Sequence, residues 1–362
     1  MVKKNIRSGM ALCSVLSAFT PSAQALLIEI DPGPGLASMP QALTAFNRAA
    51  NQWSSRIADP VTVRIDADMV PLGAGIIGQA TSVHLQGSYD TIRNAMVNDA
   101  LDEADDAVVS ALPTGGHFSA LLPVGFGLSG SLSATKANLK ALGFTGLDAS
   151  FGLTDASIEM SSGFAFDFDA SDGVDAGTID FETVAAHEIG HALGFGSAVD
   201  TVDRMAAYGQ TGDITPRTLD LFRFAAGTTF SGQVDFTLKP RDLVPGDAAM
   251  FAEPDEALAF STGRHNGDGR SAGHWQDDAL SGSLIGIMDP TLARGTSIPI
   301  AASDLRALDL IGYEITAVSV PPTLYLFVSG LLGMAVLIRR KGRRIYTRID
   351  HEGREGTQRK ST

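Results

Sequence analysis

The chain has 362 residues, a formal net charge of −14 and a single cysteine. Of its 27 basic residues, three lie in the first 25 positions and nine lie after Ile338. Three of its 41 acidic residues also lie after Ile338, so the region between carries a net charge of about −23. A negative charge of this size argues against nucleic acid and anionic lipid as partners of that region. No disulfide can form within the chain, so its stability has to come from a hydrophobic core, for which about 300 residues are sufficient.

The first 25 residues are typical of an export signal. Basic residues precede an apolar run over 10–19, and Ala23-Gln24-Ala25 provides a small-residue cleavage site. Cys13 lies within the apolar run, so the exported protein would contain no cysteine. We therefore expect a signal peptide at residues 1–25 and a protein that is exported from a bacterial cytoplasm.

The apolar pattern after the signal predicts short strands alternating with helices. Apolar residues spaced by three and four from Leu43 to Ile57 predict a helix, with Ser38 and Gln41 as its capping box. The other expected elements are strands at 26–30, 61–65, 82–85 and 156–168, a turn at 31–35, and helical segments at 92–96 and 107–112. No element is expected in the glycine- and serine-rich stretch 115–147.

The second half is expected to contain one long helix followed by an irregular region. Asp180 is a suitable N-cap for this helix. Strands and helices that alternate early and then give way to a long helix place the chain in the α+β class. The remaining expectations are a loop-rich insertion at about 198–273 with a helical candidate at 220–224, and a final helix at 303–311 that Ser303 caps and Gly312 ends.

The most informative stretch is His187-Glu188-Ile189-Gly190-His191, which Gly194 follows three residues later. Two histidines four apart on a helix project from the same face, so they can bind one metal ion together. The glutamate beside the first histidine can act as a general base on metal-activated water. Only seven histidines occur in the chain, so a chance match to this spacing is rare. The stretch therefore predicts a zinc hydrolase.

The motif and its glycine resemble the opening of the signature of metzincins, a group of zinc metalloproteases. In most metzincins a histidine follows three residues after the glycine, where this chain has Ser197. The pair His274-Trp275, followed by Ile287-Met288-Asp289-Pro290, is similar instead to the leishmanolysin-like branch, in which the third histidine arrives late, before a Met-turn. By this resemblance, Met288 lies beneath the ligand histidines without binding the metal.

The resemblance covers roughly residues 178–313. It implies a metzincin-like α+β fold in which a twisted mixed sheet and the active-site helix form an upper half. The loop-rich insertion and the C-terminal helix would form a lower half, with a cleft between the two. It also implies a zinc endopeptidase whose partner is a protein or peptide substrate.

The identity of the third zinc ligand decides the class of site. His274 is the favoured candidate, because both its residue type and its Trp and Met-turn context agree. Asp200 and His265 are the alternatives, followed by Ser197 or a water molecule. The remaining histidines are expected to be uninvolved: His84 and His117 on the surface or in loops, and His351 in the tail.

Two functions are consistent with this site. In the first, His187, His191 and His274 bind zinc, and Glu188 is the general base that activates water for attack on a peptide carbonyl. The alternative is a non-catalytic surface or matrix protein whose metal site is structural or vestigial, which the serine at position 197 and the C-terminal segment motivate.

Two acidic turns raise the question of a second metal, calcium. Four aspartates (Asp167, Asp169, Asp172 and Asp175) surround Gly173, and Asn266-Gly267-Asp268-Gly269 forms another turn rich in oxygen atoms. Calcium prefers several such oxygens from a flexible loop, whereas Asp-Gly turns usually need no ion. Calcium is therefore a secondary expectation beside zinc.

The C-terminal segment is expected to contact the membrane. Residues 317–338 carry no charge and are long enough to span a bilayer, and the basic residues that follow place the tail at 339–362 in the cytoplasm. Val320-Pro321-Pro322-Thr323, the apolar stretch and Arg339-Arg340 together resemble the PEP-CTERM sorting signal, which implies processing by an exosortase-type enzyme. This chain lacks the glutamate between the prolines and continues to Thr362, so both a cleaved signal and a retained anchor are open.

The expected organisation has four parts. They are the signal peptide at 1–25, the metalloprotease domain at 26–316, the transmembrane or sorting segment at 317–338 and the basic cytoplasmic tail at 339–362. The domain is expected to lie in the cell envelope, anchored to the membrane or at the cell surface.

Overall fold

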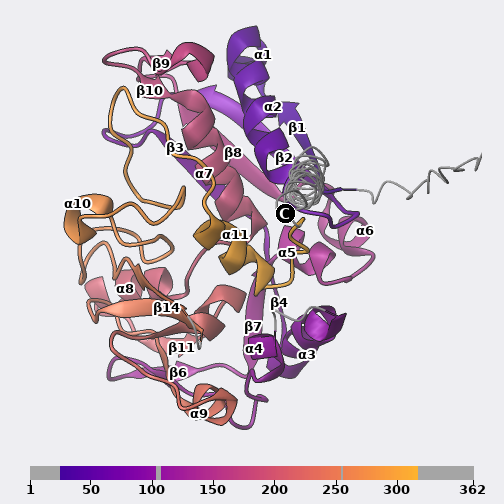
Figure 1. Ribbon diagram of the computed structural model, residues 1–362, viewed down its shortest axis with the longest axis vertical. Coiled ribbons are helices and arrows are strands. Elements are labelled where there is room, and N and C mark those ends of the chain that lie inside the picture. Colours follow the sequence, from indigo (N-terminus) through magenta and orange to yellow (C-terminus); the bar gives the residue numbers. More distant parts are fainter. Residues whose placement is uncertain (1–24, 103–106, 254–255, 317–362) are drawn as a thin grey trace, which may run out of the picture. The chain divides into compact units, whose positions relative to one another are not determined.

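The computed structural model describes residues 25–102, 107–253 and 256–316, which form the ribbon coloured by sequence in Figure 1. The expected signal peptide, apart from Ala25, lies outside the described residues, and so do the expected membrane segment at 317–338 and the tail at 339–362. Within the described ranges, no helix is both long enough and apolar enough to cross a membrane.

A mixed sheet of four strands forms the scaffold. Its order is β1 (Leu27–Pro32), β2 (Thr62–Val70), β8 (Ala156–Ser161) and β3 (Gly78–Ser82). The first three strands are parallel and β3 is antiparallel to β8, which leaves β3 at the edge. Alternate side chains of β2 are buried because successive residues of a strand point to opposite faces.

Two helices pack against each other beside this sheet, α2 (Pro40–Ser54) and α7 (Phe181–Leu193). The indole N–H of Trp53 donates to the carbonyl of Ala186 at 2.8 Å, and Arg48 forms an ion pair of 2.8 Å with Glu182. The predicted helix is confirmed, but its predicted capping box is wrong. The N-cap is Met39 without a side-chain hydrogen bond, because the Ser38 hydroxyl donates to the carbonyl of Gly35 instead.

The segment between β3 and β8 contains the helices predicted at 92–96 and 107–112, together with strands and a helix in the stretch 115–147, where no element was expected. Strand β4 (His84–Ser88) pairs with β7 (Ser131–Thr135), which leads directly into α5 (Lys136–Ala141). The side chain of Thr135 caps α5 by accepting from the backbone N–H of Asn138. The remaining elements here are α3 (Tyr89–Asp99), a 3-10 turn (Ala100–Asp102), α4 (Ala107–Ser110), β5 (Ala120–Leu121), β6 (Phe126–Leu128) and α6 (Leu147–Phe151).

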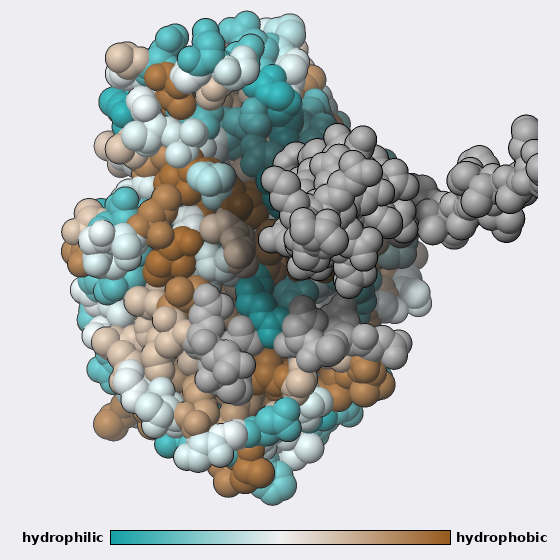
Figure 2. All heavy atoms as spheres, viewed as in Figure 1, coloured by the Kyte–Doolittle hydropathy of each residue, from teal (hydrophilic) through white to brown (hydrophobic). Residues whose placement is uncertain are grey.

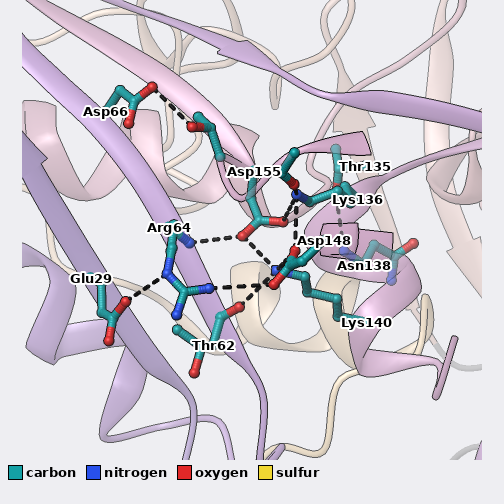
Figure 3. Close-up of polar contacts among 12 residues, drawn as sticks. Glu29, Thr62, Arg64, Asp66, Thr135, Lys136, Asn138, Lys140, Asp148 and Asp155 are labelled. Atoms are coloured by element: carbon teal, nitrogen blue, oxygen red, sulfur yellow. Dashed lines mark hydrogen bonds and ion pairs between the residues drawn. The ribbon is translucent and has the colours of Figure 1, made fainter. Parts of the chain in front are cut away.

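A buried charge cluster joins α5 and α6 to the sheet, and we call its four residues (Lys136, Lys140, Asp148 and Asp155) the lysine–aspartate cluster (Figure 3). Lys136 Nζ lies 3.0 Å from Asp148 Oδ1 and 3.3 Å from Asp155 Oδ1. Lys140 Nζ lies 2.7 Å and 2.8 Å from the same two carboxylates. Because Lys136 and Asp155 are fully buried, each charge depends on the other members of the cluster for compensation.

The insertion at 198–273 is more ordered than the predicted loop-rich region. Its elements are α8 (Val199–Ala207), β11 (Gly212–Ile214), a 3-10 turn (Thr218–Phe222), β12 (Arg223–Ala225), α9 (Gln233–Leu238), β13 (Arg241–Asp242), β14 (Ala249–Glu253) and β15 (Glu256–Phe260). Strands β12, β14 and β15 form an antiparallel sheet, and β11 and β13 pair with β6 and β5. The helical candidate at 220–224 is instead the end of the 3-10 turn and the start of β12.

Aromatic rings and the buried guanidinium group of Arg241 explain this order. Phe222, Phe224 and Phe236 pack together, and the guanidinium of Arg241 lies 4.7 Å from the ring centre of Phe224. Arg241 donates to the carbonyls of residues 221, 236 and 239, so a buried charge satisfies backbone acceptors of the insertion. The acceptor at residue 221 lies 20 positions before Arg241, and local patterning does not reveal such a contact.

A hydrophobic core extends from the sheet through α7 to the aromatic residues of the insertion. Shorter elements complete the fold, and they are α1 (Pro34–Ala37), β9 (Phe166–Asp167), a 3-10 turn (Ala170–Asp172), β10 (Ile179–Asp180), α10 (Asp278–Ser281) and α11 (Ala302–Asp309). The strand predicted at 156–168 is therefore two strands, and the turn predicted at 31–35 is the end of β1 and the start of α1. On one face, hydrophilic residues gather over α1 and α2 and hydrophobic residues gather near α11 (Figure 2). The predicted α+β class is confirmed.

The cap predicted for the last helix is wrong. Its N-cap is Ala301, and the buried carboxylate of Asp304 accepts from the backbone N–H of Ala301 at 2.7 Å. The Ser303 hydroxyl donates instead to the carbonyl of Ile285. A carboxylate three residues into the helix thus takes the role that the sequence assigned to a serine.

Candidate metal centre

Helix α7 positions the first two histidines, and both of its ends follow from the sequence. Asp180 is the N-cap, as predicted, and its carboxylate accepts from the backbone N–H groups of Glu182 and Thr183. Gly194 ends the helix with φ of +130°, a conformation that residues with a Cβ rarely adopt. The chain therefore turns sharply away directly after the second histidine.

The structure brings together the three histidines that the sequence singled out. The Nε2 atoms of His187 and His191 are 3.2 Å apart, and each lies 3.1 Å from Nε2 of His274. All three rings are half-buried and converge on one point through the same nitrogen. Residues from one helical turn and from a loop more than 80 positions later thus form a nearly equilateral triangle of nitrogen atoms.

The opposite nitrogen of each ring fixes its tautomer. Nδ1 of His187 donates to the carbonyl of Ile287 at 2.7 Å, and Nδ1 of His191 donates to the carbonyl of Phe195 at 2.7 Å. Nδ1 of His274 lies 3.0 Å from the carbonyl of Ser271. A carbonyl oxygen only accepts, so each Nδ1 carries the proton and each neutral ring directs a lone pair into the triangle.

Three lone pairs facing one another at this distance repel unless a cation lies between them. Nitrogen ligands at 2.0–2.1 Å from a tetrahedral zinc ion are about 3.3 Å apart, close to the observed 3.1–3.2 Å. Burial lowers the pKa of His187 to about 4 and that of His191 to about 3, so both rings are neutral at pH 7, as metal binding requires. The donor set, its spacing and its protonation therefore fit zinc.

Glu188 lies beside the triangle, on the side of the edge strand β3. Its side chain is almost fully buried, and a Cβ added at Gly78 would lie 3.1 Å from its Oε1 atom. Burial raises the pKa of Glu188 to about 8, and a hydrogen bond with the backbone of Ala80 acts in the opposite direction. A carboxyl group held in an apolar setting with a raised pKa is suited to exchange a proton near neutral pH.

Asp200, which the sequence also offered as a third ligand, has a different role. Its carboxylate accepts from the Ser271 hydroxyl at 2.8 Å and from the backbone N–H of Ala272 at 2.7 Å. These bonds hold the residues directly before His274, including the carbonyl that orients the His274 ring. Asp200 therefore positions the third histidine and does not replace it.

Ser197 and three further histidines also lie outside the triangle. The Ser197 hydroxyl is buried and donates to Asp220 Oδ1 at 2.6 Å, so it is engaged away from the metal-binding group. His117 and His265 are exposed. His84 and His265 line the cleft described below without joining the three converging rings. His274 is thus the third member of the group, as predicted.

Met288 packs against the motif helix between the two histidines. A Cβ at Gly190 would collide with the Met288 sulfur, so a side chain at this position of the helix would displace Met288. Met288 is fully buried, and it follows Ile287, whose carbonyl orients His187. The thioether thus lies directly behind the helical turn that carries the histidines, as expected.

A buried carboxylate fixes this turn and the His274 segment together. Asp304 Oδ1 accepts from the indole N–H of Trp275 at 2.8 Å, and Oδ2 accepts from the backbone N–H of Ile287 at 2.8 Å. Asp304 was not predicted from the sequence, because its partners come from two other segments. The only local sign of this role in the sequence is that Asp304, followed by Leu305, lies near the start of the last helix.

The triangle lies in a cleft with a volume of about 760 Å³. One wall is the segment 75–82, which includes the edge strand β3, and another is formed by Ile287 and residues 289–292. The insertion adds three arginines, Arg204, Arg217 and Arg264, which were not predicted as site residues. They are isolated in sequence, so no local pattern marks them.

The calcium expectation gains no support from the two acidic turns. The Asp167 carboxylate accepts from the backbone N–H groups of Asp169 and Asp175, and Asp268 accepts from Thr262 and Arg270. These bonds account for the turns as loop structure. A separate group, Asp277, Asp278 and Asp289, is held by backbone N–H groups and by an ion pair of 2.7 Å between Asp277 and Arg270.

The arrangement as a whole provides three neutral nitrogen ligands, one carboxyl group and an open cleft. Such a set can hold a metal ion with a free coordination position and transfer a proton beside it. Comparison with known proteins gives no match to this chain among family models, curated proteins or solved structures.

Proposed function

We propose that the protein is a zinc-dependent endopeptidase. The observation that carries the proposal is the triangle of Nε2 atoms, in which three neutral imidazoles direct lone pairs at one point inside a cleft. Three protein nitrogens and an open side are typical of catalytic zinc sites, whereas structural sites are closed by four protein ligands.

The residues of the chain have separate roles in this proposal. His187, His191 and His274 hold the zinc ion, which when bound lowers the pKa of water to about 7 and polarises a carbonyl group. Glu188 accepts the proton of the attacking water and passes it to the departing amine. Its burial keeps bulk water away from that proton.

The edge strand offers a way to hold the substrate. Within the described residues, β3 pairs only with β8, and its residues line the cleft beside Glu188. An extended peptide can pair with such an edge through main-chain hydrogen bonds, so its carbonyls would be held beside the zinc site. Extended binding of this kind suits a peptide substrate and not a small amide.

The resemblance to metzincins agrees with several features of the geometry. The chain leaves α7 at Gly194, His274 returns from a long insertion, and Met288 lies behind the helix. We propose a metzincin-like fold of the leishmanolysin-like arrangement on these grounds. A structural or vestigial site would need a fourth protein ligand or a disrupted triangle, and the ligand group in the described ranges contains three residues.

We also propose that the domain acts in the cell envelope of a bacterium. This proposal rests on the sequence of the terminal segments, with a signal peptide at 1–25, a transmembrane or sorting segment at 317–338 and a basic tail at 339–362. The membrane and an exosortase-type enzyme are the proposed partners of the C-terminal segment. Mass spectrometry of the protein isolated from cells tests whether the signal peptide and the C-terminal segment are removed.

The decisive experiment compares the purified protein with its Glu188→Ala variant. Both should contain one zinc ion per chain by elemental analysis, and only the parent should cleave a denatured protein, with a loss of about 10² to 10⁴-fold in the variant. His265→Ala is the control, because this histidine lies in the cleft but outside the triangle. Cleavage by zinc-free protein, or none by zinc-loaded parent, would disprove the proposal.

A further inference from the structure

Three arginines in the cleft stand apart from every other basic side chain of the described residues. The remaining lysine and arginine side chains each have an ion pair or hydrogen bond within the protein. In the same part of the chain, no hydrogen bond or ion pair holds the guanidinium groups of Arg204, Arg217 and Arg264. All three line the cleft that contains the histidine triangle.

The absence of partners is unexpected for a domain with this charge. The region between the terminal segments carries about −23, so acidic side chains are abundant on its surface. Other arginines of the domain do pair with carboxylates, as Arg48, Arg64 and Arg270 show. Five donors on each guanidinium of the cleft are instead left for solvent or for a ligand.

The backbone makes room for one of these groups. A Cβ at Gly196 would lie 2.5 Å from Nη1 of Arg217, so the guanidinium occupies the space that the missing side chain leaves. Gly196 directly follows Phe195, whose carbonyl orients the His191 ring. Arg217 is therefore held next to the segment that leaves the metal-binding helix, close to the place where a substrate bond would be cleaved.

The four acidic residues that line the same cleft have other partners or roles. Asp203 accepts from the backbone N–H groups of His265 and Asn266 at 2.8 Å each. Asp200 accepts from the segment before His274, Asp289 accepts from the backbone N–H groups of Asp278 and Thr291, and Glu188 has the proposed catalytic role. These four groups oppose the positive charge of the arginines, but they do not occupy the guanidinium donors.

We propose that Arg204, Arg217 and Arg264 select acidic peptides, by pairing with aspartate or glutamate side chains on either side of the bond that is cleaved. The proposal rests on the proposed endopeptidase function and names its substrate class. Guanidinium groups pair with carboxylates through two parallel hydrogen bonds, and such charge-assisted bonds are stronger than neutral ones. A pairing in a cleft is worth about 10-fold in affinity for each carboxylate bound, and it weakens as salt is added.

The test uses two peptides that differ only in charge. One has glutamates on both sides of a central apolar pair, and the other has glutamines at the same positions. Their dissociation constants are measured with zinc-loaded Glu188→Ala protein of full length, which binds without cleaving, at low and at high salt. Cleavage by the parent protein is measured for the same pair as kcat/KM.

We expect the glutamate peptide to bind about 10-fold more tightly or better, with the preference reduced by salt. Two variants should bring the ratio of the two dissociation constants towards one. The first is the single substitution Arg217→Gln, and the second combines Arg204→Gln with Arg264→Gln. Arg294→Gln removes the same charge outside the cleft, where its guanidinium donates to the carbonyl of Gly177, and should keep the ratio. Thermal unfolding of each variant confirms that it is folded.

The outcomes separate this proposal from the proposed function. Equal binding of the two peptides overturns the acidic preference, even where both peptides are cleaved. A preference for the glutamate peptide that persists in both arginine variants also overturns it. Tighter binding of the glutamate peptide without any cleavage by the parent supports the preference and refutes the endopeptidase.

Discussion

Two groups of titratable side chains in this molecule are built on opposite principles. In the lysine–aspartate cluster, Lys136 and Lys140 face Asp148 and Asp155, so every buried charge has a partner of opposite sign. In the histidine triangle, three acceptors of the same kind face one another at 3.1–3.2 Å. The first group is complete as the chain folds, whereas the second would be completed by the cation that we propose it binds.

The contrast between the two groups shows how a functional group can be distinguished from a structural one. A balanced cluster stabilises the fold by satisfying its own charges, and removing one member leaves another uncompensated. A group of like acceptors contributes nothing favourable by itself, so the fold has to hold it in place through outside bonds. Here backbone carbonyls accept hydrogen bonds from the Nδ1 atoms, and the carboxylates of Asp200 and Asp304 hold the segments around His274 and Ile287.

The largest expected effect is on the triangle. His274→Ala should lower the zinc affinity by more than about 100-fold, since even the partners behind a ligand are worth 10–100-fold. Cleavage should be lost with the metal. Zinc binding is measured by competition with a chromogenic chelator, and stability by thermal unfolding.

The same variant tests whether the three histidines of the triangle repel one another in the absence of a cation. With zinc at a thousand times the parent's dissociation constant, the parent should gain about 4 kcal/mol, and the variant should lose most of this gain. Without zinc, the variant should lose at most about 1 kcal/mol of stability, because the lost hydrogen bond to the carbonyl of Ser271 is offset by the removal of a repulsive contact. A larger destabilisation of the metal-free variant would show that the triangle is favourable without a cation.

The next effect is on the lysine–aspartate cluster. Lys136→Met should destabilise the protein by about 3–5 kcal/mol, because it leaves the buried Asp155 carboxylate short of positive charge. The zinc content should not change. Chemical denaturation measures the stability, and Lys239→Met is the control, since its ion pair with Asp235 is exposed, 3.8 Å long and worth less than about 1 kcal/mol. Equal effects of the two substitutions would show that the cluster is not a special source of stability.

The smallest expected effect concerns a third arrangement, a buried carboxylate without a cation. Burial raises the pKa of Asp59 to about 6, although its Oδ2 atom accepts from the backbone N–H of Glu314 at 2.9 Å. The folded state therefore binds a proton that the unfolded state has already lost between pH 4 and 6, so this group makes stability fall as the pH rises through that window.

Asp59→Asn should remove this fall, because the amide oxygen can still accept the same hydrogen bond. The variant should be more stable than the parent above pH 6, by at most about 3 kcal/mol, and equal to it near pH 3. Denaturation curves at several pH values measure the difference. A variant that is less stable at pH 7 would show that the ionised carboxylate is favourable here.

Sequence patterns predicted those features that depend on neighbours along the chain. The helix of the H-E-x-x-H motif, its N-cap at Asp180 and its end at Gly194 follow from spacing and from the backbone freedom of glycine. The proximity of His274 to the motif came from a resemblance to known metalloproteases. Spacing alone cannot bring a residue more than 80 positions away to the same point.

The features that escaped prediction depend on contacts between distant segments. The caps at Ser38 and Ser303 failed because Met39 starts α2 without a side-chain bond and Asp304 serves α11. The order of the insertion depends on Arg241 and the rings around it, and the cleft arginines are single residues. Such arrangements become visible only when the chain is folded.

The route by which the third imidazole arrives has a consequence for timing. His187 and His191 come together within one helix. His274 reaches them only when the insertion folds and Asp200 binds the loop that precedes His274. If the protein holds zinc as we propose, two imidazoles would bind the ion more weakly than three, so metal binding would be coupled to the last stage of folding. A chain that is not yet fully folded would then lack hydrolytic activity, which would appear only in the finished molecule.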